Sequence, residues 1–387
     1  MPTFRLTPAS TEDYRLLAEQ RLPRFLFDYI DGGAYQETTL RSNVEDFRTL
    51  GLNQRVMRDV SQLNTAIELL GESWSMPLAL APIGMGGMMA RRAEVQAVRA
   101  ANAFGVPFCL STVSICSLEE VARAATRPFW FQLYMLRDRG AVRELLQRAK
   151  AVGVTTLAFT VDLAVVGARY RDVRNGMGGG VGAFGRLRAG LIDYLLHPGW
   201  LGDVGLGGGP HVFGNLKHYV PKATTPADFK NWVDAQFDPS VTWKDIEQLR
   251  TEWDGKLVIK GVLSVEDAKA ATDAGADAVI VSNHGGRQLD GVSSSIAMLP
   301  RVAEALAGRV AILMDGGVRS GQDVARAIAS GARAVLIGRP WIWALAAQGE
   351  TGLKKLLATL KGELRVSMAL TGTTSIGALT REIFSPH

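Results

Sequence analysis

Histidine is scarce in this chain, and one histidine stands where a catalytic base would be useful. The sequence holds five histidines, and only His284 comes just after an apolar run, in Val281-Ser-Asn-His-Gly-Gly-Arg-Gln-Leu-Asp290. An imidazole can act as a general base near neutral pH, and a guanidinium can hold an anion through paired hydrogen bonds. His284 and Arg287 could therefore be a base beside an anion clamp, although a histidine that caps a loop would give the same local pattern.

Polar side chains also follow four other apolar runs. They are Gln132 with Tyr134, Thr160 with Asp162, Lys260, and Asp315. Each alone could be a helix cap or a buried pair, but packing does not require a whole ring of donors, acceptors and charges. Arg169, seven residues after Asp162, could bring a second guanidinium to the same anion. Two arginines suit a carboxylate, because each can bind it through two nitrogens.

The last two strand-to-loop junctions have the features of a phosphate site. Asp315-Gly-Gly-Val-Arg319 follows one apolar run, and Gly338-Arg339 follows the next. Glycines let the backbone N–H groups approach a phosphate closely, and the arginines supply charge. We therefore expect a phosphate-bearing substrate or cofactor. Gly180-Val-Gly-Ala-Phe-Gly185 also matches GxGxxG, but it follows no predicted strand, so we reject it as a dinucleotide motif.

Eight short apolar runs must position these groups. Each run is continuously apolar, which is typical of a strand buried on both faces of a parallel sheet, and segments of helical periodicity lie between the runs. This alternation predicts an α/β fold, a (β/α)₈ TIM barrel. An open doubly wound sheet is the weaker alternative, because it usually has fewer strands. The runs are Pro77–Ala81, Pro107–Leu110, Phe129–Leu133, Leu157–Val161, Lys256–Ile259, Ala278–Val281, Ala311–Met314 and Ala334–Ile337.

Two segments are additional to a plain barrel, and we expect residues 1–387 to form a single domain. Residues 1–76 precede the first run and are expected to be a mostly helical extension. The interval after the fourth run is roughly 70 residues longer than a usual βα unit. An insertion at about residues 170–240 is therefore predicted at the catalytic end. It could be a lid or a docking surface, or a surface elaboration without a role.

Composition excludes several classes of protein. Hydrophobic residues make up 47% of the chain, which rules out global disorder. Cys109 and Cys116 fit neither a disulfide framework nor a CxxC pair, so a reducing, intracellular compartment is favoured. The net charge, 43 − 38 = +5, is spread evenly and does not indicate a nucleic-acid partner. No zinc-protease, P-loop, EF-hand or serine-hydrolase motif is present, and no metal site is expected.

Together these motifs resemble the family of FMN-dependent 2-hydroxy-acid dehydrogenases and oxidases over nearly the whole chain. The most specific is Ser282-Asn-His-Gly-Gly-Arg-Gln-Leu-Asp290. The others are Phe131-Gln-Leu-Tyr134, Thr160-Val-Asp162, Ile259-Lys-Gly261, Asp315-Gly-Gly-Val-Arg319 and Asp28-Tyr-Ile-Asp-Gly-Gly33. Within the family, residues 27–35, 110–114 and 167–172 are most similar to the bacterial respiratory L-lactate dehydrogenases. One departure is Leu163-Ala-Val-Val166, which replaces a proline-containing segment and could alter the substrate range.

The resemblance implies oxidation of L-lactate, a 2-hydroxy acid, to pyruvate. His284 takes the hydroxyl proton, and Asp162 stabilises the resulting imidazolium. Tyr134 forms a hydrogen bond to the substrate oxygen. Lys260 lies beside the flavin and stabilises its anionic reduced form.

The resemblance also implies which residues bind substrate and cofactor. Arg169 and Arg287 hold the substrate carboxylate, with help from the Tyr29 hydroxyl. FMN is bound by Lys260 together with Pro82, Ile83, Gly84, Ser111, Gln132, Thr160, Ser282, Asp315, Gly316, Gly317, Val318, Arg319, Gly338 and Arg339.

The resemblance further implies an external electron acceptor, a respiratory quinone. It places the protein in the cytoplasm, as a homotetramer on the inner face of the cell membrane. The segment 187–206, where Arg188 stands among apolar side chains, is a plausible membrane contact. The bland alternative is that this segment only covers the substrate.

Other readings of the same residues remain open. A hydroxy-acid oxidase would pass the electrons to O₂ and make hydrogen peroxide, and the small Gly84 makes oxygen access conceivable. A mandelate-type dehydrogenase would share every catalytic residue. A flavin-free phosphate-binding barrel is a third alternative. A non-catalytic binding protein is weaker, since it would not need His284, Lys260 and Asp162 together.

Overall fold

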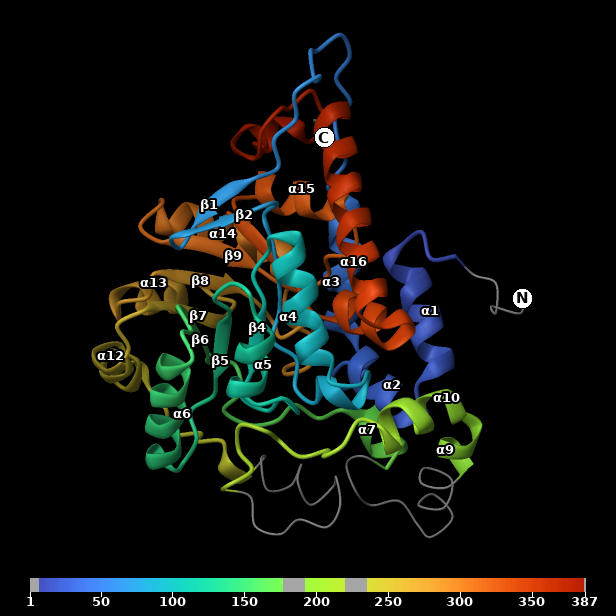
Figure 1. Ribbon diagram of the computed structural model, residues 1–387. Helices are drawn as coiled ribbons and strands as arrows, with labels where there is room; N and C mark the ends of the chain where they lie inside the picture. Colours follow the sequence, from blue (N-terminus) through green and yellow to red (C-terminus); the bar gives the residue numbers. More distant parts are fainter. Residues whose placement is uncertain (1–6, 177–191, 220–234, 386–387) are drawn as a thin grey trace.

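Eight parallel strands form a closed ring, so the expected (β/α)₈ barrel is confirmed. The computed structural model describes residues 7–176, 192–219 and 235–385 and orders the strands β3-β10-β9-β8-β7-β6-β5-β4 (Figure 1). The Leu80 amide donates to the Pro107 carbonyl at 2.9 Å and so joins β3 to β4, which closes the ring. The strands are β3 (Leu78–Leu80), β4 (Cys109–Ser111), β5 (Trp130–Leu133), β6 (Thr156–Thr160), β7 (Lys256–Val262), β8 (Ala278–Val281), β9 (Ala311–Met314) and β10 (Ala334–Ile337).

Helices follow the strands and cover the outside of the ring (Figure 1). Several begin at side-chain caps: the Ser117 and Ser264 hydroxyls accept from backbone amides three residues later, at 3.3 and 3.0 Å. Such caps satisfy amides that lack a partner in the first turn. The helices are α4 (Ala93–Phe104), α5 (Leu118–Ala124), α6 (Arg139–Ala151), α12 (Trp243–Glu252), α13 (Val265–Asp273), α14 (Ser295–Leu306), α15 (Gly321–Ala329) and α16 (Arg339–Leu370).

The inside of the barrel changes from apolar to polar along the strands. One buried apolar cluster includes Trp130, Ala158, Val258, Ile280 and Leu313. Side chains of a strand alternate between its two faces, so the residue two positions further on points to the same side. Those next positions are Gln132, Thr160, Lys260, Ser282 and Asp315. The strands therefore present a polar ring at their carboxyl ends, above an apolar plug.

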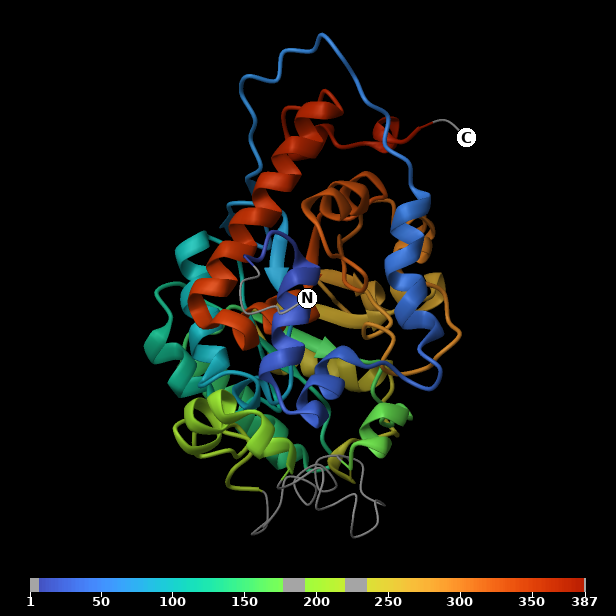
Figure 2. The same ribbon diagram turned by 90° about the vertical axis from the view of Figure 1, so that its right-hand side faces the viewer.

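The segment before the barrel is helical only in its first part. It forms α1 (Thr11–Arg21), α2 (Arg24–Asp31) and α3 (Thr38–Thr49), and α1 packs along α16 (Figure 2). A hairpin of β1 (Ile67–Leu69) and β2 (Glu72–Trp74) follows, which the expected mostly helical extension did not include. Leu69 and Trp74 belong to the apolar cluster inside the barrel. The hairpin thus closes the end of the barrel opposite the polar ring.

The insertion lies between β6 and β7. Its described part contains α7 (Tyr170–Arg174), α9 (Asp193–Leu196), α10 (Pro198–Trp200) and η4 (Leu201–Leu206). It packs against the N-terminal helices: the Arg24 amide donates to Asp193 at 2.7 Å, and the rings of Phe25 and Tyr194 are 5.8 Å apart. The glycines at 178–180 and the apolar and basic residues at 187–191, which entered the sequence predictions, lie outside the described residues.

Candidate active site

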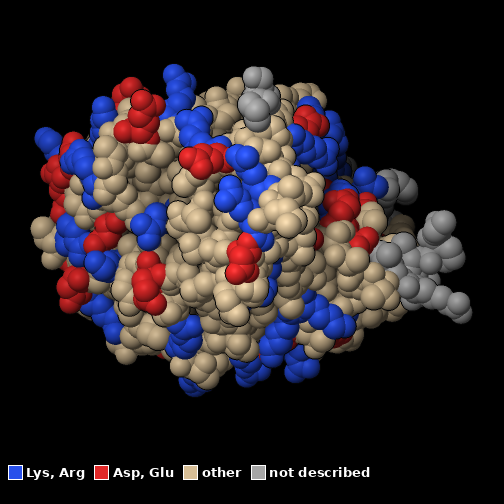
Figure 3. All heavy atoms as spheres, turned by 90° about the horizontal axis from the view of Figure 1, so that it is seen from above, with Lys and Arg blue, Asp and Glu red and all other residues tan. Residues whose placement is uncertain are grey.

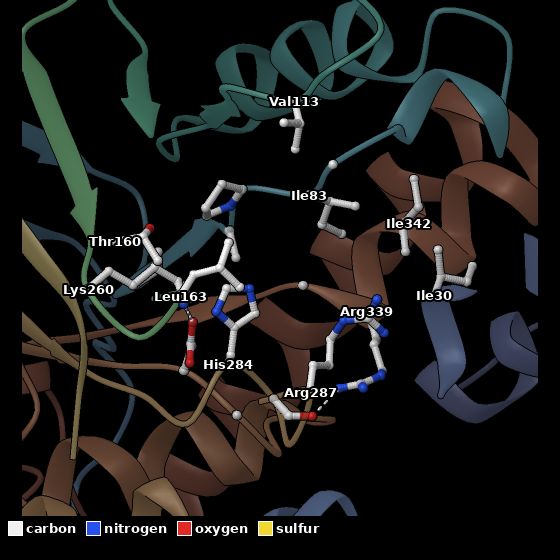
Figure 4. Close-up of a pocket in the computed structure, with 18 of the residues that line it drawn as sticks. Ile30, Ile83, Val113, Thr160, Leu163, Lys260, His284, Arg287, Arg339 and Ile342 are labelled. Atoms are coloured by element: carbon white, nitrogen blue, oxygen red, sulfur yellow. Dashed lines mark hydrogen bonds and ion pairs between the residues drawn. The ribbon is translucent and has the colours of Figure 1, made fainter. Parts of the chain in front are cut away.

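A cavity opens at the carboxyl ends of the strands (Figure 4). Most residues named from the sequence line it: Tyr29, Pro82, Ile83, Gly84, Tyr134, Thr160, Arg169, Lys260, His284, Arg287, Asp315, Gly316, Gly317, Val318, Arg319, Gly338 and Arg339. Four of the named residues lie just behind the lining. Asp162 contacts His284, and Ser282 contacts Lys260. Ser111 forms a hydrogen bond with Gln132 and accepts one from the amide of Val113, which lines the cavity. The polar ring predicted from separate strand ends is thus assembled around one space.

His284 and Asp162 form the central pair of this site. His284 Nδ1 lies 2.8 Å from Asp162 Oδ1, although the two residues come from loops after different strands. Burial alone would raise the pKa of Asp162, but the charges of His284 and Lys260 outweigh it and lower that pKa. The carboxylate only accepts hydrogen bonds, so it places the imidazole hydrogen on Nδ1. Nε2 is then the nitrogen that can take a proton.

A second charged pair lies deeper in the barrel. Lys260 Nζ is 2.8 Å from Asp315 Oδ2 and donates to the Ser282 hydroxyl at 3.0 Å. Burial would lower the pKa of Lys260, but the carboxylates of Asp315 and Asp162 raise it above its ordinary value. Lys260 is therefore a fixed positive charge on the wall of the cavity (Figure 4).

Two arginines are placed to clamp an anion. One nitrogen of Arg287 donates to the Tyr29 and Gly32 carbonyls at 2.6 and 2.8 Å, and its guanidinium lies 4.9 Å from the Tyr29 ring centre. Burial and the neighbouring charge of Arg169 lower the pKa of Arg287 to about 10. The charge of Arg169 thus disfavours the charge of Arg287, and a bound carboxylate would offset that repulsion.

Arg319 and Arg339 bring further positive charge to the cavity, and Arg339 lies next to Arg287, since both donate to the Gly32 carbonyl at 2.8 Å (Figure 4). Burial lowers the pKa of Arg319 to about 10, and burial together with the charges of Arg287 and Arg319 lowers that of Arg339. Arg339 donates to the carbonyls of Asp31, Gly285 and Gly32 at 3.1, 2.9 and 2.8 Å. The lowered pKa values mean that the positive charges of the two guanidiniums lack enough negative charge around them. This suits a site that binds a strong anion such as a phosphate.

Tyr134 completes the catalytic side of the cavity. Burial and the charge of Asp162 raise the pKa of its hydroxyl, so the phenol keeps its proton and can donate a hydrogen bond. Its ring packs edge-on against Phe237 at 5.0 Å. The hydroxyl is thus held as a neutral donor near the His284 and Asp162 pair.

FMN, the cofactor implied by the resemblance, fits the polar atoms that the protein leaves unused. Within the described part of the chain, Gln132 Nε2, Thr160 Oγ1 and Asp315 Oδ1 are buried without a hydrogen-bond partner. Buried polar atoms normally have partners, so these three indicate a missing polar ligand. The flavin ring of FMN offers donors and acceptors along its edge, and Arg319 and Arg339 could bind the phosphate of FMN. The residues present therefore suit FMN.

Several apolar walls of the cavity were not predicted from the sequence, namely Val113, Phe213 and Phe237. Leu163 and Val166 also line it, and their segment was already expected to affect the substrate range. Phe213 and Phe237 come from the insertion, whose path over the barrel no local pattern predicts. Asn215 ties this part of the chain to the β4 loop: its amide donates to the Ser111 carbonyl at 3.2 Å and accepts from the Leu118 amide at 2.8 Å.

Sequence comparison agrees with this geometry. The family described as FMN-dependent dehydrogenase matches residues 18–386. A protein named L-lactate dehydrogenase from Caulobacter sp. (strain K31) is 54% identical over 97% of this chain and 98% of the relative. Another of that name, from Pseudomonas aeruginosa (strain LESB58), is 54% identical over 97% of both chains.

Solved structures show the same architecture. The monotopic membrane protein (S)-mandelate dehydrogenase matches with a TM-score of 0.91 and 35% identity, over 99% of this chain and 100% of that chain. A mandelate oxidase matches with a TM-score of 0.82 and 37% identity, over 97% of this chain and 98% of that one. The barrel, the arrangement of charges at its mouth and the match over nearly the whole length lead to one conclusion: the chain belongs to the FMN-dependent dehydrogenase family.

Proposed function

We propose that this chain oxidises L-lactate to pyruvate with FMN as its cofactor and passes the electrons to an external acceptor. The observation that carries the proposal is the 2.8 Å contact between His284 Nδ1 and Asp162 Oδ1 at a cavity also lined by Arg169 and Arg287. The relatives named L-lactate dehydrogenase, 54% identical to this chain, support lactate as the substrate.

The side chains divide the work on the substrate. Arg287 and Arg169 hold the carboxylate, and the Tyr29 hydroxyl assists them. His284 takes the proton of the substrate hydroxyl on Nε2, and the charge of Asp162 stabilises the imidazolium that results. Tyr134 donates to the substrate oxygen. When bound, FMN supplies an acceptor for the two electrons that leave the α-carbon.

The same geometry supports an assignment of the cofactor contacts. Thr160, Gln132 and Lys260 would bind the polar edge of the flavin ring, with Ser111 and Ser282 behind them. The backbone of Pro82, Ile83 and Gly84 would contact the ring, and Asp315 would hold the ribityl chain. Arg319 and Arg339, with the backbone of Gly316, Gly317, Val318 and Gly338, would hold the phosphate.

Anaerobic mixing of the purified holoenzyme with L-lactate tests the proposal. We expect bleaching of the flavin absorbance with one pyruvate formed per flavin, no reduction by D-lactate, and release of FMN on acid extraction. If (S)-mandelate reduced the flavin and L-lactate did not, a mandelate-type activity would replace the one proposed. Hydrogen peroxide formed in air at the full turnover rate would favour an oxidase.

The external acceptor is a quinone, reached from the surface of a membrane. In the described part of the chain, no helix is long and apolar enough to cross a bilayer. Leu195, Leu196 and Leu206 are 63%, 71% and 80% exposed, and apolar side chains at a surface suit insertion into the head-group region. The likeness to a structure described as a monotopic membrane protein supports a peripheral location, which we place on the inner face of the cell membrane.

Residues 1–387 form one domain that assembles as a homotetramer. Support for the single domain comes from Tyr29, which α2 contributes to the cavity, and from the packing of α1 on α16. Support for assembly comes from the family resemblance and from Val56 and Met57, which are 73% and 98% exposed. Light scattering coupled to gel filtration would measure the mass directly.

A further inference from the structure

A second cavity lies beside the catalytic one. Its volume is about 560 Å³, and it is lined by the ends of β6 and β7, residues 238–242 and the start of α12. Tyr134, Thr160 and Leu163 line both cavities. The two spaces therefore adjoin along these three residues.

Of these three residues, Leu163 is the one whose side chain can form no hydrogen bond. Tyr134 is held by its ring contact with Phe237, and Thr160 is part of β6. Leu163 presents an aliphatic side chain next to His284 (Figure 4). Its side chain can therefore be shortened without removing a hydrogen bond from the catalytic groups.

The backbone around Leu163 is fixed independently of that side chain. The Gln288 amide donates to the carbonyls of Asp162 at 2.7 Å and Val165 at 3.0 Å. Gly167 packs so closely on the His284 loop that an added Cβ would lie 2.4 Å from the Arg287 carbonyl oxygen. A change at Leu163 should consequently open the wall and leave the strap of residues 162–167 in place.

The second cavity suits an aliphatic chain. Its apolar lining includes Phe159, Val241, Trp243 and Ile246, and no lysine or arginine occurs among the described residues that line it. Two of its carboxylates are already engaged: Asp238 lies 2.6 Å from Arg139, and Asp267 accepts from the Ser264 hydroxyl at 2.8 Å. Among its described lining residues the cavity thus offers no positively charged side chain for the carboxylate end of a 2-hydroxy acid, which belongs on the arginines of the first cavity.

We propose that Leu163 sets the upper limit on the side chain of the substrate. It closes the catalytic cavity off from a second subsite, which would accept the unbranched aliphatic side chains of longer L-2-hydroxy acids. This inference rests on the proposed oxidation of a 2-hydroxy acid. One methylene gained or lost in an apolar pocket changes selectivity by roughly 10- to 200-fold. A single wall residue can therefore decide which chain lengths are used.

The test compares Leu163→Ala with Val166→Ala in the holoenzyme. Val166 is on the same strap and lines the first cavity but not the second. We expect Leu163→Ala to raise kcat/KM for L-2-hydroxyhexanoate relative to L-lactate by about 10-fold or more, and to tighten binding of 2-oxohexanoate relative to pyruvate. Val166→Ala should not change either ratio by that amount. Thermal unfolding and flavin content confirm that both variants fold.

A blocking variant shows where the longer chain goes. Ala164 lines only the second cavity, so Ala164→Phe added to Leu163→Ala should reverse the gain. A gain that survived this block, or no gain in Leu163→Ala, would overturn the proposal. So would a variant that changed only the KM for quinone, since the second cavity would then serve the acceptor. If L-lactate failed to reduce the flavin of the wild-type enzyme, the proposed function would be contradicted instead. That measurement uses no variant, so it is independent of the test of Leu163.

Discussion

At the scale of single residues, the site depends on His284 as the proton acceptor, and Asp162 already holds its imidazole in position. Replacement of His284 by glutamine keeps a similar volume but removes the nitrogen that takes the proton. General-base catalysis is worth roughly 10²- to 10⁴-fold, so flavin reduction by L-lactate in His284→Gln should slow by at least that range. Stopped-flow absorbance measures the rate. FMN content should stay at the wild-type level, and a near-normal rate would remove His284 from its role.

Asp162 owes its position to a glycine. Gly261, at φ +103°, lies in a register irregularity between β7 and β8, and an added Cβ would be 2.6 Å from Asp162 Cγ. Gly261→Ala should therefore push the carboxylate away from His284 and lower the rate of flavin reduction by about 10- to 100-fold, part of the full value of base catalysis.

Gly153→Ala is the matched control, because Gly153 also has a positive φ, +80°, but nothing lies within 4 Å of its added Cβ. Both variants carry the backbone cost of a left-handed alanine, of the order of 1 kcal/mol. Equal loss of activity in both would show that strain, rather than displacement of Asp162, explains the effect.

At the scale of elements, the hairpin β1–β2 closes the end of the barrel opposite the active site. Trp74 is 1% exposed, and its ring centre is 5.6 Å from that of Trp130 inside the barrel. Trp74→Ala should lower the free energy of unfolding by about 3–5 kcal/mol, because it leaves a cavity in a packed interior. Urea unfolding measures this loss. The folded variant should still be reduced by L-lactate, since Trp74 is at the end opposite the site. A loss of about 0.5 kcal/mol or less, the size expected of an exposed residue, would contradict this role.

The elements also show why some features were predictable from the sequence and others were not. Lys260 and Asp315 could be assigned to one site because buried parallel strands put their carboxyl ends on one side of a barrel. The hairpin was not predicted, because strands of three residues carry too little alternation to distinguish them from a loop. Phe213 was not assigned to the pocket, since its position depends on long-range contacts such as those of Asn215. Leu163 was expected to affect the substrate range only because its segment departs from the family pattern, and its place beside His284 was not predicted.

At the scale of the whole molecule, charge and apolar surface are distributed differently. Basic and acidic side chains are interspersed on the face shown in Figure 3. Three of the exposed leucines, Leu195, Leu196 and Leu206, lie in α9 and η4, near the N-terminal helices. The arm between α3 and β1, residues 50–66, lies at the opposite end of the molecule (Figure 1), and its Val56 and Met57 are 73% and 98% exposed. The two apolar surfaces allow a direct comparison.

Replacement of Leu195, Leu196 and Leu206 by serine should weaken binding to vesicles that contain anionic lipid. Each fully buried leucine side chain contributes about 1.5–3 kcal/mol, so even partial insertion of three predicts a loss of at least 10-fold, measured by vesicle sedimentation. Quinone-linked turnover should fall in parallel, whereas flavin reduction by L-lactate should be unchanged, because none of the three lines the catalytic cavity. Val56→Ser with Met57→Ser removes apolar surface from the far arm. Once light scattering shows that this variant keeps the wild-type mass, its vesicle binding should be intact. If both sets weakened binding equally, the effect would reflect general surface hydrophobicity, and α9 with η4 would not be the membrane contact.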